Sequence, residues 1–578
     1  MKKHIPQLPS YNDRLAIRDA LLTPQSGVTL REGLFKTVFD NNRAFLRTLD
    51  MGAMMYWFDQ KTGTPTDAQP YRGHFEDNLK GSTLSMFLMG AGNVLRWVED
   101  EELARRIDVL TQRLYSAAEP DGFLMPVREE DFAYREYPHY VRIWLSYALE
   151  AVGLSHDAHA YEVLRKWQDW FNACPDLPII RYLELAFQGV VASTSVYMTP
   201  IGKKEDIDVT ISAYEEGWRL AQFMRREKDA VHIRRQPGSE PHAHGSELEA
   251  FEGYLDLYRA TGRNYYLHAV QGAWELYHDD WQHAGGGIVM CEGMPSNYPG
   301  CRWLNAKNHY NELCCTSFWL YLNLRLHRLF PDEERYMNEV EKSLFNVAIA
   351  NQDGGSGIRY FAYLEGHKQE SGQVHCCCGV GTRIFGSLPE LLYSVAPDTI
   401  AVNLYAPSEL EFGSLRLINE GNIPYSDEVR LTFAGSAERP VRLRLRIPAW
   451  TAEDVTVFRN GEAVLRARPG SYAVLEGCWK AGDVITYTLK QAFRLTPYRG
   501  AEEIAGKKRY AVERGPILYA LCGEDALAFD DWDSEHYADW LTRRDGTLDY
   551  AVRGSDLTLR PYFALGEDVP FVVYAVMR

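Results

Sequence analysis

Three consecutive cysteines at residues 376–378 are the feature of this 578-residue chain that most needs a chemical explanation. A second unusual group, Glu-Leu-Cys-Cys at residues 312–315, opens a strongly apolar stretch. Five of the ten cysteines therefore fall in two short segments. Thiolates and a carboxylate are ligands that Zn²⁺ accepts. Crowding of this kind indicates metal binding or catalysis rather than a disulfide framework.

The residue types alone leave three interpretations of these cysteines open. The first is a metal site with a catalytic role, and the second is a closed structural zinc site. Structural zinc sites usually take their cysteines from CxxC pairs, which this chain lacks. The third interpretation is a set of buried free thiols.

Other side chains suited to acid–base chemistry or to hydrogen bonding lie elsewhere along the chain. Glu292 stands in the Gly-rich segment AGGGIVMCEGMP, where a loop carboxylate could act as a general acid or could simply be a solvated surface residue. Four histidines fall near expected helix starts, where each alone is commonly a core or helix-end residue. Collected around one cavity, they would donate hydrogen bonds to hydroxyl groups: His74, His139, His242 and His244.

From about residue 30 to 395 the apolar residues recur at helical spacing. The clearest segments are 34–49, 82–98, 140–154, 247–262, 311–330 and 335–350. Roughly twelve such segments alternate with loops rich in Gly, Pro and Asp. About twelve consecutive helices predict an (α/α)₆ barrel, a six-hairpin toroid whose inner helices and connecting loops line one cavity.

Near residue 398 the pattern changes to short, alternating, β-branched runs separated by turns such as Asn-Gly at 460–461. This pattern predicts one or two antiparallel β-sandwiches after the toroid. The predicted division of the chain is an N-terminal extension over 1–29 that joins the β-sandwich, a catalytic toroid over 30–397, and a β-sandwich over 398–500. Residues 501–578 form a second sandwich or complete the first.

The composition of the chain argues against some classes of binding partner. The formal net charge of −17 would repel phosphate backbones, which argues against nucleic acid. We find no apolar run long enough to span a membrane and no secretory signal, so the cytoplasm is the expected compartment. Aromatic residues make up 13% of the chain and suit either sugar stacking or a large core.

Several ordered motifs give the chain a resemblance to the β-L-arabinofuranosidase family of glycoside hydrolases, family 127. The motifs run over most of the 578 residues. They are GVTLREGLFKTVFDNNRAFL, DGFL (121–124), GYLDLYRATGRNYYL, Glu312-Leu313-Cys314, the pair Cys376-Cys377 followed by Arg383, LRIPAW, GCWKAGDVITYTL and RGPILY (514–519).

The resemblance implies retaining hydrolysis by a zinc-bound cysteine. It implies that Glu312, Cys314, Cys376 and Cys377 hold Zn²⁺, that Cys376 attacks the anomeric carbon, and that Glu292 is the acid/base. By the same resemblance Tyr360 lies beside the nucleophile, and His139 and His244 bind sugar hydroxyls, with His74 and His242 as further substrate-binding candidates. The expected substrate is a small oligosaccharide or glycoside.

The chain departs from the family pattern at the cysteine triplet. The family often follows its cysteine pair with Pro-Pro-Asn, whereas this chain has Cys378-Gly379-Val380. Cys378 is therefore an alternative metal ligand, although the spacing to Arg383 favours Cys376 and Cys377. A divergent member could also act on other β-linked furanoses or deoxy-sugars.

Two other functions share parts of this pattern. A polysaccharide lyase or unsaturated-uronyl hydrolase would keep the toroid without needing the cysteines. A non-catalytic sugar-binding protein would keep a structural zinc. A homodimer is the candidate assembly.

Overall fold

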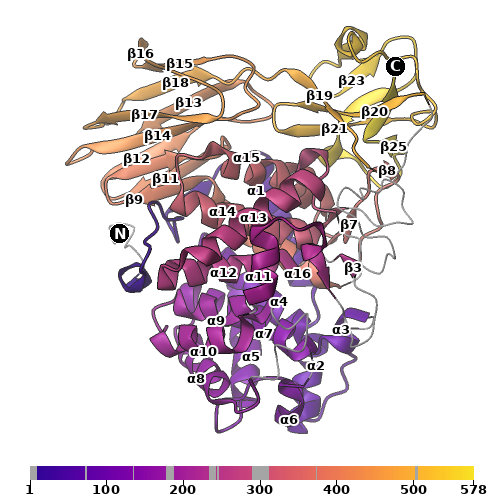
Figure 1. The fold of residues 1–578 in the computed structure, drawn as a ribbon. Helices are drawn as coiled ribbons and strands as arrows, with labels where there is room; N and C mark the ends of the chain where they lie inside the picture. Colours follow the sequence, from indigo (N-terminus) through magenta and orange to yellow (C-terminus); the bar gives the residue numbers. More distant parts are fainter. Residues whose placement is uncertain are drawn as a thin grey trace.

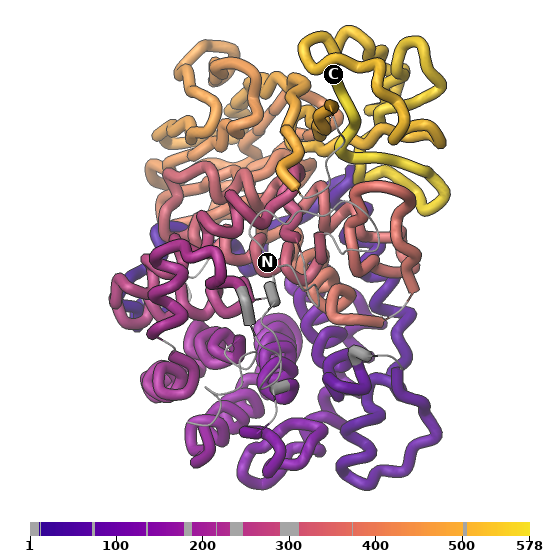
Figure 2. The backbone as a smooth tube through the Cα atoms, turned by 45° about the vertical axis from the view of Figure 1, so that its right-hand side comes forward, coloured from indigo at the N-terminus to yellow at the C-terminus, as the bar shows by residue number. Residues whose placement is uncertain are grey.

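The computed structural model places a helical region below two β-rich regions that lie side by side above it (Figures 1 and 2). It describes residues 10–71, 74–134, 136–177, 188–215, 217–233, 242–243, 247–289, 311–372, 374–500 and 506–578.

Six helices form a closed inner ring. In the described part of the chain α4 contacts α7, α7 contacts α9, α9 contacts α12, α12 contacts α14, α14 contacts α16, and α16 returns to α4. Their bounds are α4 (Ser82–Leu95), α7 (Glu136–Ser155), α9 (Val190–Tyr197), α12 (Leu248–Thr261), α14 (Leu313–Leu329) and α16 (Cys376–Gly386). Inner helices are buried nearly all round, as in α4, where residues 82–94 are all buried. No described helix is both long and apolar enough to cross a membrane.

Six further helices surround this ring, and five of them pack on the inner helix that precedes them in the chain. They are α1 (Leu34–Thr48), which packs on α16 and α4, and α5 (Glu101–Ser116), α8 (His159–Ala173), α10 (Lys204–Tyr214), α13 (Asn264–Asp280) and α15 (Glu334–Ser343). Because each outer helix leads the chain back, all six inner helices run in the same direction. Their N-termini therefore meet at one mouth of the toroid and their C-termini at the other.

This arrangement confirms the predicted helical toroid, and the strongly periodic segments gave the right helices. The segment predicted as one helix over 335–350 is α15 followed directly by a π-helix at Leu344–Ile349. Short helices decorate the barrel at α2 (Met51–Thr62), α3 (His74–Asn78), α6 (Glu129–Phe132) and α11 (Gly217–Met224).

The middle β region contains a seven-stranded and a four-stranded sheet. In order, the first holds β1 (Val28–Leu30), β11 (Ser408–Phe412), β12 (Leu415–Asn419), β13 (Glu428–Phe433), β18 (Val484–Thr488), β15 (Val455–Arg459) and β16 (Glu462–Ala467). The second holds β17 (Ser471–Gly477), β14 (Val441–Ile447), β10 (Thr399–Val402) and β9 (Tyr393–Ala396). Burial alternates along the strands, as in β13, so one face of the sheet packs into the core.

Two features of these sheets bear on the sequence predictions. Strand β1, which precedes the toroid, pairs antiparallel with β11, so the N-terminal segment reaches the middle β region. Strands β10 and β14 pair in parallel, whereas the pattern predicted antiparallel pairing throughout. Strands β11–β13, which lie between β10 and β14 in the sequence, belong to the other sheet. They form the long connection that parallel neighbours require in place of a hairpin.

The C-terminal β region is one nine-stranded sheet. Its strands are β19 (Phe493–Pro497), β20 (Lys508–Arg514), β21 (Ile517–Cys522), β22 (Leu541–Arg543), β23 (Tyr550–Val552), β24 (Thr558–Pro561), β25 (Phe571–Val572), β26 (Tyr574–Met577) and β8 (Glu365–Gly366). Strand β8 comes from the segment just before the cysteine triplet and pairs with β25 (Figure 1). The C-terminal sheet is therefore joined by backbone hydrogen bonds to the helical region.

A buried ion cluster fastens the toroid to the middle β region. Arg446, on β14, has no exposed surface and lies 2.7 Å from Glu334 and 3.0 Å from Glu341, both on α15. The indole of Trp450 also donates to Glu341, at 2.7 Å. Both carboxylates depend on this one guanidinium for charge compensation inside the interface.

We predict that Arg446→Met lowers the apparent free energy of unfolding by about 3–5 kcal/mol, because two buried carboxylates lose their cation. The control is Arg442→Met on the same strand, whose pair with Glu476 is solvent-exposed and should contribute less than about 1 kcal/mol. Urea unfolding of the three proteins measures the difference. Equal losses in the two variants would contradict the assignment.

Candidate active site

Four side chains converge at the mouth where the inner helices begin. Glu312, Cys314, Cys376 and Cys377 each offer one ligand atom, and these four atoms all lie within 4.8 Å of one another. Cys377 Sγ is 3.3 Å from Cys314 Sγ and 3.8 Å from Glu312 Oε1. Three sulfurs and one carboxylate oxygen in a buried setting are a donor set that fits a borderline-soft four-coordinate cation. The structure thus brings together all four predicted ligands.

Local backbone structure brings the two halves of the cluster together. Strand β4 (Asn311–Glu312) pairs with β7 (Phe361–Ala362), and the backbone N–H of Leu313 donates to the carbonyl of Tyr360 at 3.2 Å. Helix α14 starts immediately afterwards, so Glu312 precedes its first turn and Cys314 lies within it. Helix α16 starts at Cys376, after His375 in an extended conformation. The site is therefore built on two helix N-termini and one short strand pair.

The electrostatics single out Cys376 among the three sulfurs. Hydrogen bonds from the Cys314 and Cys377 thiols, and then the nearby His375, lower the pKa of Cys376 well below its ordinary value. Burial raises the pKa of Cys314 and of Cys377. Cys376 also occupies the first turn of α16, where the helix dipole favours a thiolate. It is the one cluster residue that is not fully buried, and its sulfur lies 3.5 Å from the Tyr360 hydroxyl.

The carboxyl group of Glu312 is held from its other side by a fourth thiol. Cys315 Sγ donates to Glu312 Oε2 at 3.0 Å, and burial raises the pKa of Cys315, which keeps the thiol protonated. Burial also raises the pKa of Glu312 to about 7. A cation bound to Oε1 would favour the ionised form of this carboxyl. Sequence reasoning noticed Cys315 but gave it no role.

Cys378 points away from this cluster. Its sulfur lies 3.7 Å from the Ile358 carbonyl oxygen and 3.7 Å from His375 Nε2, and burial raises its pKa to about 12. The next residue explains the close packing here: a side chain at Gly379 would collide with Met86 on α4. Cys378 therefore lies against the Ile358 backbone and His375, outside the cluster, while the next residue packs on α4.

Comparison with known families agrees with this geometry. A family model described as the β-L-arabinofuranosidase, GH127 catalytic domain, matches residues 27–390, and the model of the GH127 middle domain matches residues 399–491. The chain belongs to this family. The resemblance drawn from the sequence motifs is confirmed, and membership of family 127 sets aside the lyase and uronyl-hydrolase alternatives.

Individual relatives are distant. A non-reducing-end β-L-arabinofuranosidase of Bifidobacterium longum is 24% identical over 262 residues, which are 41% of this chain and 39% of that protein. A GH127 β-L-arabinofuranosidase from Geobacillus stearothermophilus T6 has a TM-score of 0.77 at 17% identity and covers 96% of this chain and 100% of that chain. A second GH127 β-arabinofuranosidase gives 0.75 at 19%, covering 98% and 99%. These structures show the shared fold.

The remaining predicted site residues of this GH127 member are placed as follows. His139 has no exposed surface; its ring lies 4.4 Å from that of Phe132, and Nδ1 is 3.4 Å from the Tyr214 hydroxyl. His74 begins α3, and His242 lies in β3 (His242–Ala243). Glu292 and His244 lie outside the described residues.

Two residues near the cluster were missed by sequence reasoning. Burial, together with the negative charge of Cys314 and Glu249, raises the pKa of Tyr140 on α7 well above its ordinary value. Glu249, on α12, is fully buried, and neither carboxyl oxygen has a hydrogen-bond partner among the residues that the structure describes. Both residues sit in the first turns of inner helices. Tyr140 directly follows His139, so the YPHY motif was the available signal, but a helix turns 100° per residue and sends the neighbours to different surroundings.

We predict that His139 makes the stability of this family member pH-dependent. Burial, and then the charge of Arg142, lowers the pKa of His139 from 6.5 to about 3. The unfolded chain therefore takes up this proton first, so the contribution is complete above about pH 6.5 and is lost at about 1.4 kcal/mol per pH unit as the pH falls toward 3.

His139→Gln removes this titration. Between pH 7 and pH 5, wild type should lose about 2 kcal/mol more apparent unfolding free energy than the variant. Urea unfolding at both pH values tests this. Parallel pH profiles for the two proteins would contradict the prediction.

Proposed function

We propose that the protein is a retaining, exo-acting glycoside hydrolase that releases terminal β-L-arabinofuranosyl groups from small oligosaccharides or glycosides. The observation that carries the proposal is the position of Cys376. Cys376 is the one partly exposed residue of a buried Glu/Cys₃ cluster and begins helix α16, and its sulfur lies 3.5 Å from the Tyr360 hydroxyl. Family membership supports the substrate class.

In the first half-reaction, a bond forms between Cys376 Sγ and the anomeric carbon while the bond from that carbon to the leaving oxygen breaks. We assign Glu292 as the acid that gives its proton to this oxygen. In the second, a water oxygen bonds to the anomeric carbon, the carbon–sulfur bond breaks, and Glu292 takes the proton of the water. Two displacements at one carbon give net retention.

Thiol chemistry explains why such a nucleophile needs its neighbours. A thiolate attacks well but leaves poorly, so the sulfur must be kept deprotonated and its charge stabilised on departure. The Tyr360 hydroxyl and the first turn of α16 both favour the thiolate. Zn²⁺ held by Glu312, Cys314, Cys376 and Cys377 would supply further charge stabilisation.

We predict that Cys376→Ser lowers kcat/KM for an aryl β-L-arabinofuranoside by about 10³-fold or more, because the serine hydroxyl is a far weaker nucleophile at neutral pH. Cys378→Ser is the matched control, since it changes the neighbouring thiol outside the cluster and should retain activity within about tenfold. Loss of activity in both variants alike, or in neither, would argue against the assignment. Absence of hydrolysis of any furanoside by the wild type would remove the substrate class.

We further predict that Cys315→Ala weakens Zn²⁺ binding by about 10–100-fold, because Glu312 loses the hydrogen bond that holds its second oxygen. Competition with a chromophoric chelator measures the affinity independently of turnover. Cys378→Ala is the control and should bind Zn²⁺ like the wild type. An unchanged dissociation constant for Cys315→Ala would show that Glu312 is positioned without it.

A further inference from the structure

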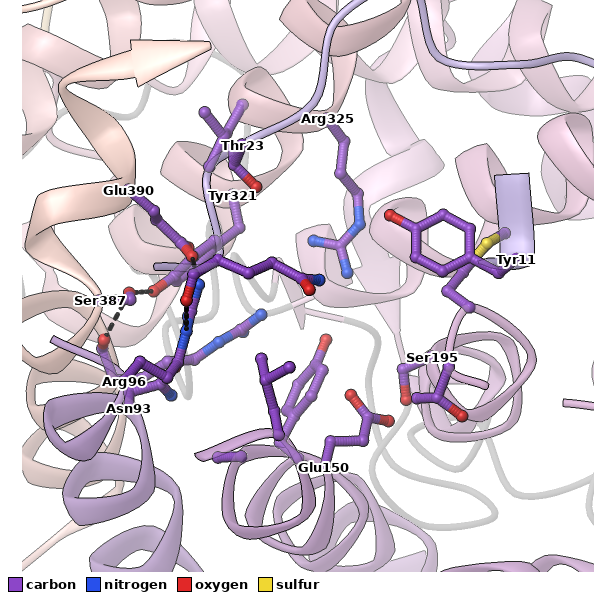
Figure 3. A pocket seen from close by; sticks show the side chains of 18 of the residues that line it. Tyr11, Thr23, Asn93, Arg96, Glu150, Ser195, Tyr321, Arg325, Ser387 and Glu390 are labelled. Carbon is purple, nitrogen blue, oxygen red and sulfur yellow. Dashed lines mark hydrogen bonds and ion pairs between the residues drawn. The ribbon is translucent and has the colours of Figure 1, made fainter. Parts of the chain in front are cut away.

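A cavity of about 270 Å³ lies at the end of the toroid opposite the cysteine cluster. It is walled by the C-terminal turns of the inner helices, including Asn93 of α4, Glu150 of α7, Ser195 of α9, Arg325 of α14 and Arg383 of α16 (Figure 3). Residues of the N-terminal segment, Tyr11 and Thr23 among them, complete the wall. None of its lining residues belongs to the cluster, and neither the family match nor the proposed reaction uses it.

This cavity is separate from the cysteine cluster because side chains fill the space inside the ring of helices between the two ends. Cys376 and Arg383 are seven residues apart on α16, roughly 10 Å along the helix axis. The intervening layer holds the fully buried Glu249 and Glu252 of α12, and Glu252 forms an ion pair with Arg325. A ligand at one end therefore does not touch the other.

The charges around the cavity balance. Five guanidinium groups line it, and five carboxyl groups line it or pair with those guanidinium groups. The arginines are Arg96, Arg259, Arg325, Arg328 and Arg383, and the acids are Asp19, Glu150, Glu252, Asp256 and Glu390. Three of these acids, Glu150, Asp256 and Glu390, line the cavity itself, whereas Asp19 and Glu252 lie behind the wall. Every arginine of the wall is paired with at least one carboxylate, and such paired charges favour a neutral polar ligand over an anion.

Two polar atoms in this wall have no hydrogen-bond partner among the described residues: an acceptor on Glu150 and a donor on Arg383. Glu150 points into the cavity beside Ser195 (Figure 3), and its Oε1 accepts no hydrogen bond. Arg383 is about nine-tenths buried, with its guanidinium 4.0 Å and 3.7 Å from the ring centres of Tyr147 and Tyr321, and its Nη1 donates to nothing. Buried polar groups left unpaired are costly, so a ligand that both donates and accepts would be stabilised here.

We propose that this cavity binds a single neutral monosaccharide. Vicinal hydroxyl groups of a sugar donate to a carboxyl oxygen and accept from a guanidinium at the same time, which matches Glu150 Oε1 and Arg383 Nη1. The volume is just below the range of about 300–1,000 Å³ that holds drug-sized ligands, and so suits one sugar ring. Tyr11 and Tyr161 also line the cavity, and aromatic rings are suitable partners for the C–H surfaces of a sugar.

Isothermal titration calorimetry with L-arabinose, D-xylose and D-galactose tests the proposal. The key variants are Leu154→Trp, which enlarges a residue that lines the cavity and is 40% exposed, and Glu150→Leu, which removes the acceptor. We expect at least one sugar to bind wild type and Leu154→Ala alike and to lose about tenfold or more affinity in both key variants. Cys376→Ala should bind that sugar at this cavity with unchanged affinity.

Sugar binding that is the same in wild type, Leu154→Trp and Glu150→Leu would overturn the proposal, because the sugar would then occupy only the cysteine end. Sulfate or D-glucuronate binding about tenfold tighter than every neutral sugar would overturn the ligand class. If Glu150→Leu fails to fold by circular dichroism, Leu154→Trp against Leu154→Ala decides alone. The result is independent of whether the protein hydrolyses arabinofuranosides.

Discussion

The common direction of the six inner helices is the constraint on which the rest of the structure depends. Each outer helix carries the chain back before the next inner helix begins, so every inner helix presents its N-terminus to one mouth and its C-terminus to the other. The aligned dipoles make the first mouth favourable for anions and the second for cations. The low-pKa thiol of Cys376 lies at the first mouth, whereas five arginines, each paired with an acid, lie at the second.

This polarity also helps to explain how a thiol with a lowered pKa is possible in so buried a place. A thiolate in an apolar interior would be strongly disfavoured, and burial raises the pKa of the neighbouring thiols accordingly. Cys376 escapes this effect because two thiols donate to it and because it sits in the first turn of α16. The ring of helices therefore supplies Cys376 with its electrostatic surroundings as well as its position.

Much of the fold could be predicted from the sequence, because the inner helices are long and strongly periodic and the turn to β structure near residue 398 is sharp. The four members of the cluster were also predicted, by residue type and by the resemblance. The sequence could not decide among three adjacent cysteines. On a helix they point in directions 100° apart, and only packing shows that Cys377 faces Cys314 while Cys378 faces the Ile358 carbonyl and His375.

Other misses have the same origin. A two-residue strand such as β8 is too short for the sequence to predict its partner in the C-terminal sheet. The parallel pairing of β10 with β14 joins strands that are far apart in the chain. Tyr140 and Glu249 lie on helices that the sequence predicts. The direction in which each side chain points depends on how its helix is rotated about its own axis, which the sequence does not give. The division of the chain at residues 30, 398 and 501, the homodimer and the cytoplasmic location stay predictions.

The pairing of β8 with β25 has a consequence for how the protein is made. Tyr360 lies beside the cysteine cluster, and β8, which follows it closely in the chain, pairs with Phe571–Val572. Arg359 and Arg509 add ion pairs across the same junction, to Glu567 and Glu365. Residues up to Val572 must therefore be synthesised before β8 gains this support. The neighbourhood of Cys376 is completed only at that stage, although the helices that carry the other cluster residues are synthesised long before.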